Sequence, residues 1–237
     1  MEGMDTLIAL VTGANKGIGK EIAGELARRG AVVHVGCRDV ERGRAAAAEI
    51  AGDARPLVLD VTDSDSIAAA VAQLGSLDIL VNNAGISGEN RSPVDEDLEA
   101  FRRIYETNLF GVVAVTNAFL PLLRGSAHPR IVNISSGTGS LAVSTERPES
   151  GGGFAAYRSS KAALNALTIY YAQALAGDGV KVNALAPGLR RTDLNAVAAA
   201  SGGDPAEAAV AAADLALLPD EGPSGAFVDW TGAPVPW

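Results

Sequence analysis

The sequence predicts an α/β protein built on a doubly wound, seven-stranded parallel sheet with helices on both of its faces. Short β-branched runs alternate along the chain with longer segments rich in alanine and leucine, which is typical of repeated βα units. A glycine-rich turn also follows the first of these runs and opens a helical segment. The 237 residues suit one such domain, and we expect residues 1–237 to fold as a single unit.

The expected strands are short runs of apolar and β-branched residues with little polar alternation, as strands covered on both faces require. Right-handed crossovers between successive strands then produce the doubly wound arrangement. In chain order the strands are expected at 7–11, 32–36, 55–59, 77–81, 129–134, 180–184 and 226–229.

The segments between the strands have helix-forming composition. Asp63 stands where an N-cap is expected, and Gly30 where a helix should end. The helices are expected at 17–29, 40–50, 63–74, 95–123, 155–175 and 205–217.

Two segments interrupt this alternation, at about 137–156 and 188–203. The first begins rich in glycine and serine, and the second begins with two arginines and becomes rich in alanine. Both follow expected strand ends, where open α/β sheets bind their ligands. We therefore expect two substrate-binding flaps rather than domain linkers.

Charge and cysteine content exclude several classes of protein. Nineteen basic and 28 acidic residues give a net charge of −9 without a basic patch, which argues against nucleic-acid or anionic-membrane partners. No uninterrupted run approaches the roughly 20 apolar residues of a membrane helix. The single cysteine, Cys37, cannot form an internal disulfide, so a reducing cytoplasm is the expected compartment. No metal site is expected.

The turn after the first strand has the chemistry of a dinucleotide site. Its spacing is Gly-x-x-x-Gly-x-Gly at the start of a helix, where backbone must approach a pyrophosphate. Glu21 stands where a P-loop would require Ser or Thr, which disfavours ATP chemistry. A purely structural glycine turn is the alternative. The expected cofactor-binding residues of this turn are Gly13, Asn15, Lys16, Gly17, Ile18 and Gly19.

The end of the second strand favours NADP(H) over NAD(H). Arg38 could hold a 2′-phosphate in a bidentate fork, and Lys16 could add a second positive charge. Asp39 is the counter-argument, because an acid could serve the ribose hydroxyls. Its simpler alternative role is to begin the following helix.

Tyr157 and Lys161 are spaced to share one face of a helix. An ammonium beside a phenol favours the phenolate and makes it a more useful acid or base near neutral pH. Ser136 follows the fifth expected strand, where its hydroxyl could hydrogen-bond a substrate carbonyl. Taken singly, a core-edge tyrosine, a solvated lysine and a turn serine are the more ordinary interpretations.

These motifs in this order resemble the short-chain dehydrogenase/reductase family, a single-domain Rossmann fold, and in particular its carbonyl-reductase-like branch. The resemblance rests on residues spread over nearly the whole chain, which are Thr12 to Gly19, Asn82-Asn83-Ala84-Gly85, Asn108, Ser136, Tyr157-x-x-x-Lys161 and Pro187-Gly188. It implies reversible, NADPH-dependent reduction of a carbonyl to an alcohol.

The resemblance also implies roles for individual residues. Tyr157 would donate a proton to the carbonyl oxygen, Ser136 would polarise that carbonyl, and Lys161 would lower the pKa of Tyr157 and bind the nicotinamide ribose. Asn108 would hold a water in the proton relay. The remaining implied cofactor contacts are Asp60 and Val61 beside the adenine, Asn82, Ala84 and Gly85 along the channel, and Pro187, Gly188 and Thr192 at the nicotinamide end.

Features of the flaps bear on substrate and assembly. Four apolar flap residues predict a hydrophobic or aromatic aldehyde or ketone, and they are Leu141, Val143, Phe154 and Leu189. Arg190 and Arg191 are expected to face water. The stretch from Ser136 to Tyr157 is longer than in most family members, which favours a monomer or homodimer, with a tetramer still open.

Two other functions are alternatives to carbonyl reduction. A catalytically weak NADP(H)-binding regulator would keep the fold without the chemistry. An epimerase or dehydratase of the extended branch would need a substrate domain after Pro187, where only about fifty residues follow.

Overall fold

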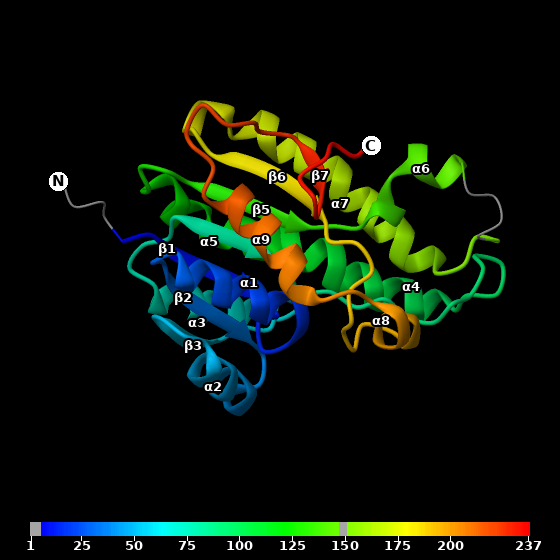
Figure 1. Cartoon of the computed structure of the whole chain (residues 1–237), viewed down its shortest axis with the longest axis horizontal. Helices are drawn as coiled ribbons and strands as arrows, with labels where there is room; N and C mark the ends of the chain where they lie inside the picture. The colour runs from blue at the N-terminus through cyan, green and yellow to red at the C-terminus, as the bar shows by residue number, and fades with distance from the viewer. Residues whose placement is uncertain (1–5, 147–150) are drawn as a thin grey trace.

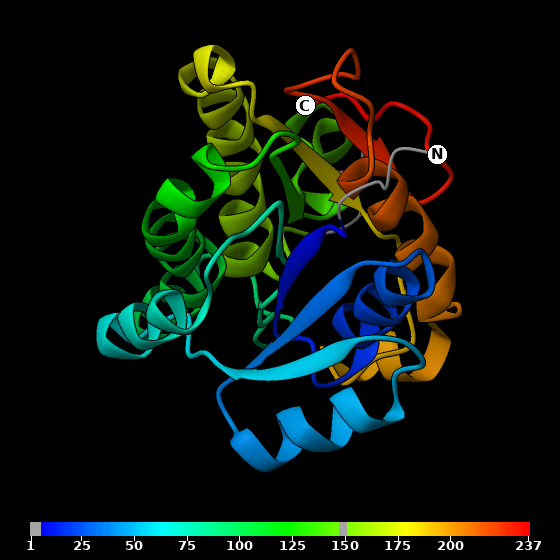
Figure 2. The same cartoon turned by 90° about the vertical axis from the view of Figure 1, so that its left-hand side faces the viewer.

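The computed structural model describes residues 6–146 and 151–237. In these residues one parallel sheet lies between two layers of helices (Figures 1 and 2), which confirms the predicted fold class. The strand order is β3-β2-β1-β4-β5-β6-β7. The strands are β1 Ile8–Thr12, β2 Val32–Cys37, β3 Ala54–Val58, β4 Ile79–Asn82, β5 Arg130–Ile134, β6 Lys181–Ala186 and β7 Phe227–Asp229.

The strand order changes direction at β1. Val11 of β1 is paired with Val35 of β2 on one side and with Val81 of β4 on the other. The connections that leave β1 and β4 therefore run toward opposite faces of the sheet, and a crevice is expected between them beyond the strand ends. The glycine-rich turn follows β1 directly at this point.

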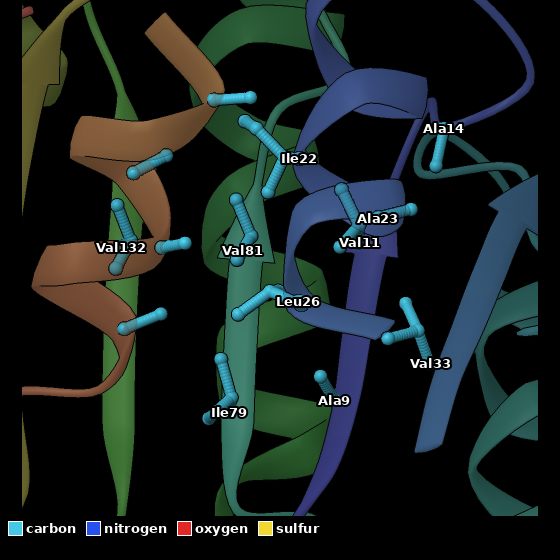
Figure 3. Packing of buried hydrophobic residues seen from close by; sticks show 14 of the residues in the cluster. Ala9, Val11, Ala14, Ile22, Ala23, Leu26, Val33, Ile79, Val81 and Val132 are labelled. Carbon is cyan, nitrogen blue, oxygen red and sulfur yellow. The ribbon is translucent and has the colours of Figure 1, made fainter. Parts of the chain in front are cut away.

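One helix layer consists of α1 Gly17–Arg28, α2 Val40–Glu49 and α9 Pro205–Ala216. Ile22 and Leu26 of α1 share a fully buried cluster with Val11, Ile79 and Val81 of the sheet (Figure 3). The α9 side of this cluster is almost entirely alanine, so α1 and α9 can both approach the central strands closely.

The other layer consists of α3 Ser64–Gln73, α5 Gly111–Arg124 and α7 Ala155–Ala174. Phe119 and Leu123 of α5 pack there against Leu80 and Ile131 of the sheet. Both faces of the central strands are thus covered, which explains why those strands appeared as continuous apolar runs in the sequence.

The helix expected over 95–123 is divided in the structure. It comprises α4 Leu98–Tyr105, a π-helical turn at Glu106–Phe110, and α5. A π-turn inserts one extra residue into a helix and rotates the side chains that follow it. Here it carries Asn108, which is fully buried. Helical periodicity alone could not predict this insertion.

This helical run, Leu98–Arg124, is the one in the described residues with the length and apolar composition to cross a membrane. Its residues Phe119 and Leu123 lie in the core between the sheet and neighbouring helices. Long core helices of α/β domains have the same composition, so this feature gives little reason to place the chain in a membrane.

Short helices occupy both expected flaps. The first contains a 3-10 turn at Gly137–Gly139 and α6 Leu141–Thr145, while residues 147–150 lie outside the described residues. The second contains α8 Ala196–Ser201, and a further 3-10 turn, Ala176–Asp178, ends α7. In Figure 1, α6 and α8 both lie toward the carboxyl ends of the strands.

Candidate active site

A cleft of about 1300 Å³ opens at the carboxyl edge of the sheet. It is bounded by the glycine turn, the ends of the central strands and both flaps. Most of the residues predicted from sequence meet there, although the chain separates them widely. The predicted residues that line it are Gly13, Asn15, Lys16, Gly17, Ile18, Gly19, Arg38, Asp60, Val61, Ala84, Gly85, Ser136, Tyr157, Lys161, Pro187, Gly188 and Thr192.

The glycine turn packs directly against the end of β4. Gly13 has φ +63°, and a Cβ there would lie 2.9 Å from the Cα of Ala84. The Thr12 hydroxyl accepts hydrogen bonds from the backbone N–H groups of Asn83 and Ala84, both at 3.0 Å. Only glycine allows this close approach of the turn to the end of β4.

Helix α1 begins without a side-chain cap. The N-cap residue Lys16 makes no capping hydrogen bond, and the first turn contains no acid. In α2, by contrast, Asp39 accepts from the Arg42 N–H at 3.0 Å. The first N–H groups of α1 therefore remain available to an anionic ligand, and the positive end of the helix faces the cleft. A dinucleotide pyrophosphate fits this arrangement.

The three charged residues predicted near this end of the cleft, Arg38, Asp39 and Lys16, have different environments. Arg38 is exposed at the rim and forms no ion pair within the described ranges. Asp39 does not line the cleft, because it caps α2 and pairs with Arg42 at 3.6 Å. Its helix-starting role is therefore the one observed. Lys16 lies against Asp193 of the second flap, with Nζ and Oδ2 3.0 Å apart.

Lys161 lies one helical turn after Tyr157 in α7, with its Nζ 5.9 Å from the centre of the tyrosine ring. Its ammonium donates to the Ile134 carbonyl at 2.8 Å and is almost fully buried. This burial lowers the pKa of Lys161 to about 8. The sequence therefore placed the two groups on one face correctly.

Burial raises the pKa of the Tyr157 phenol, and a hydrogen bond with Ser136 opposes that effect. Desolvation is the largest influence on the phenol, so the pKa of Tyr157 shifts in the direction opposite to the lowering by Lys161 that the resemblance implies. The physical reason is that burial disfavours the charged form of both groups, so it raises the pKa of Tyr157 and lowers the pKa of Lys161.

The two serines after β5 have opposite orientations. Ser136 lines the cleft, where its hydroxyl bonds Tyr157 and lies 2.9 Å from the Thr138 hydroxyl. Ser135 is buried and donates to Oδ1 of Asn165 at 2.5 Å. Successive strand residues point to opposite faces, so only one of the pair can reach the cleft.

Asn108 lies behind the cleft rather than in its lining. Its Oδ1 accepts from the N–H of Ile86 and its Nδ2 donates to the carbonyl of Ile86, each at 2.9 Å. The same Nδ2 donates to Ser160 at 3.0 Å, and the Ser160 hydroxyl donates to the Tyr157 carbonyl at 2.7 Å. Asn108 thus ties the loop after β4 to the helical turn that carries Tyr157.

Three sequence expectations for the cleft are wrong. Asn82 does not line the main cleft, because its amide donates to Asn133 at 2.9 Å and to Thr116 at 3.1 Å inside the protein. Leu141 is 67% exposed and lies outside the cleft, whereas the other three apolar flap residues line it. Arg190 was expected to face water and is instead 5% exposed.

Asn83, which belongs to the same Asn82–Gly85 segment, does line the cleft as the resemblance implies. The structure adds residues that the sequence did not indicate, because Arg103, Glu106 and Thr107 contribute from α4 and the π-turn. Arg158, the neighbour of Tyr157, also lines it. Arg103, Glu106 and Thr107 are spaced to share one face of a helix, and the sequence shows this spacing. Assigning that face to the cleft, however, requires the position of the π-turn, which the sequence does not show.

Known proteins share both sequence and fold with this chain. The family model for short chain dehydrogenase matches residues 7–201. Salutaridine reductase from Papaver bracteatum is 35% identical, with 93% of each chain covered. The NADPH-bound carbonyl reductase from chicken fatty liver has 31% identity and a TM-score of 0.84, covering 99% of this chain and 100% of that one.

A third similar protein was solved with the other nicotinamide cofactor. The 3-ketoacyl-(acyl-carrier-protein) reductase from Brucella melitensis, complexed with NADH, has 27% identity and a TM-score of 0.83, covering 96% of this chain and 97% of that one. The chain therefore belongs to the short-chain dehydrogenase family, whose members are oxidoreductases that use a nicotinamide dinucleotide and act on small molecules.

Proposed function

We propose that this member of the short-chain dehydrogenase family reduces a hydrophobic or aromatic ketone or aldehyde to an alcohol with NADPH, in a reversible reaction. The observation that carries the proposal is the convergence of Ser136, Tyr157 and Lys161 in the same cleft that receives the uncapped end of α1. When bound, the nicotinamide would supply or accept the hydride.

The chain's own residues would manage the carbonyl oxygen and its proton. Ser136 would donate a hydrogen bond to that oxygen, where negative charge develops. Tyr157 would deliver the proton, because its hydroxyl is hydrogen-bonded to Ser136 in the same cleft. Lys161 would return a proton to the phenolate, because its pKa of about 8 allows it to exchange protons near neutral pH.

The preference for NADPH rests on the residues at the end of β2. Arg38 is an exposed guanidinium at the rim of the cleft, and the neighbouring acid Asp39 is engaged in capping α2. A guanidinium can bind a phosphate with two parallel hydrogen bonds. The similar chicken carbonyl reductase binds NADPH, which supports the assignment, while the NADH complex of the Brucella protein makes a direct test necessary.

The substrate class rests on the composition of the flaps. Val143 and Phe154 of the first flap and Leu189 of the second contribute apolar surface to the cleft. An apolar wall with a few directed polar groups selects hydrophobic ligands and orients the reacting carbonyl.

The test is to follow absorbance of the reduced nicotinamide while the purified protein meets a panel of aromatic and aliphatic carbonyls. NADPH and NADH are compared, with Tyr157→Phe as the matched control because it removes one hydroxyl. Consumption of NADPH by the natural chain but not by the variant supports the proposal. NADPH binding without turnover of any carbonyl would contradict it and favour a cofactor-binding regulator.

A further inference from the structure

The second flap leaves and rejoins the body of the protein at one point. The backbone N–H of Gly203 donates to the Leu189 carbonyl at 3.0 Å, and that of Arg191 donates to the Gly203 carbonyl at 2.8 Å. The flap is therefore a loop closed at its base, with Arg190 and Gly203 side by side. Its cleft-lining residues include Leu189, Arg191, Thr192, Asp193 and Leu194.

Three elements of the fold meet on the Arg190 guanidinium at this base. Its Nε donates to the Pro187 carbonyl at 2.6 Å, just after β6. Its Nη1 pairs with Glu207 in the first turn of α9. Its Cζ lies 4.2 Å from the ring centre of Trp230, which follows β7. A buried cation is costly unless its donors are satisfied, and here a carbonyl, a carboxylate and an aromatic face satisfy it together.

The surrounding backbone is fitted closely to these two side chains. A Cβ at Gly203 would lie 2.6 Å from Nη1 of Arg190. Gly188 has φ +71°, and a Cβ there would lie 3.0 Å from Cδ1 of Trp230. Glycine at both positions therefore lets the loop close tightly over the guanidinium and the indole.

We propose that Arg190 is a positioning residue, which fixes Pro187 and Gly188 in the wall of the cleft and locks the second flap over it. Arg190 is itself among the residues that line the cleft, but its guanidinium is engaged by Glu207 of α9 and by Trp230. Its effect on turnover rests on the proposed function, whereas its effect on the flap does not.

The contacts require arginine rather than any cation. The guanidinium is planar, so it can stack on Trp230 while its edge donates to Pro187 and Glu207. A lysine ammonium could reach the Glu207 carboxylate but could not stack in this way and donate to the Pro187 carbonyl simultaneously. Arg190→Lys therefore keeps the positive charge and removes the planar guanidinium, so it tests which of the two the flap requires.

The experiment compares Arg190→Met and Arg190→Lys with the natural chain by amide hydrogen exchange over residues 188–203. Arg44→Met is the matched control, because Arg44 makes only an exposed pair with Glu41 on α2 among the described residues. We expect exchange of the flap amides to accelerate at least about tenfold in both Arg190 variants and to stay unchanged in the control. Exchange of the β5 amides should stay unchanged in all of these proteins. The Kd for NADPH should rise about three- to tenfold.

The outcomes are distinct. Flap exchange within twofold of the natural chain in Arg190→Met, or full recovery in Arg190→Lys, overturns the proposal. Faster exchange in β5 as well as the flap also overturns it, because that indicates a general stabilising role. If Arg190→Met does not fold, Trp230→Leu and Glu207→Gln each remove one contact, and unchanged flap exchange in both would be decisive against it.

A kinetic measurement extends the test. With a carbonyl that the natural chain reduces, Arg190→Met should lower kcat/KM about 10- to 100-fold, since small displacements of substrate-positioning groups have effects of that size. If no carbonyl is reduced by the natural chain, the proposed function fails, and the exchange and NADPH-binding measurements still decide the role of Arg190.

Discussion

Two buried cations at opposite edges of the sheet, Arg130 and Lys161, differ in how many partners satisfy them. At the amino edge, the Arg130 guanidinium is 2% exposed and donates to the Leu218 carbonyl at 2.9 and 2.7 Å and to Asp220 at 2.6 Å. At the carboxyl edge, the Lys161 ammonium is 5% exposed and donates to one carbonyl, that of Ile134. No carboxylate within the described residues pairs with it.

This difference separates charges that stabilise the fold from charges that serve a ligand. Asp78 at the amino edge is also engaged twice, accepting from the Ile8 N–H at 2.7 Å and from the Ser126 hydroxyl at 2.5 Å. The carboxyl edge instead leaves Lys161, Arg38 and the first turn of α1 incompletely satisfied. The buried ammonium of Lys161 weakens the folded state, and all three groups remain available for binding or proton transfer.

The largest expected effect is on the chemistry of the carboxyl edge. Tyr157→Phe should lower kcat/KM about 1000-fold, because the proton donor is removed. The free energy of unfolding should change by less than about 1 kcal/mol, since only one hydroxyl hydrogen bond is lost. Steady-state kinetics and chemical denaturation measure the two effects. Activity above a tenth of the natural level would mean that another group supplies the proton.

At the amino edge, removing the buried charge of Arg130 should affect stability and not catalysis. Arg130→Met should lower the free energy of unfolding by about 3 kcal/mol, because buried carbonyls lose their charged donor. The kcat of the folded enzyme should be unchanged. Urea unfolding with activity measured below the transition tests this, and Arg44→Met, an exposed pair, provides the control. A loss of kcat without a loss of stability would break the distinction between the edges.

Removing the charge of Lys161 should stabilise the protein. Burial lowers its pKa from 10.5 to about 8, so the unfolded chain binds the proton more tightly than the folded one. Stability of the natural chain therefore rises as the pH increases from about 8 to 10.5. Lys161→Met should gain about 2 kcal/mol at pH 7, after allowing for the hydrogen bond lost to Ile134.

The pH dependence checks the sign of this effect. The advantage of Lys161→Met should be complete below about pH 8 and should disappear as the pH rises to 10.5. Denaturation curves of both proteins across this range measure it. An advantage that grows with increasing pH would show that the ammonium is stabilised rather than penalised in the folded state.

The smallest expected effect concerns the rim of the cleft. Arg38→Ala should raise the KM for NADPH about tenfold, equivalent to about 1.4 kcal/mol, and leave the KM for NADH nearly unchanged. Arg42→Ala is the matched control, because Arg42 is a nearby exposed arginine in the first turn of α2 that does not line the cleft. Equal changes in the KM values for both cofactors would exclude a specific role for Arg38 in binding the 2′-phosphate.

The sequence predicted the strands closely. β1 was expected at 7–11 and is Ile8–Thr12, and β5 was expected at 129–134 and is Arg130–Ile134. Buried strands and glycine turns depend on local apolar runs and backbone freedom, which are visible in a few adjacent residues. The π-turn at Asn108 was not predictable, because it accompanies hydrogen bonds to Ile86, 22 residues away.

The sequence by itself thus determined the layered fold, the glycine turn at the start of a helix and the shared face of Tyr157 and Lys161. Only the tertiary structure decided that Lys16 pairs with Asp193, 177 residues later, and that Arg190 is enclosed by Glu207 and Trp230. The physical reason is that backbone conformation follows largely from neighbours in the chain, whereas the environment of a charge is set by partners that folding brings to it from distant segments.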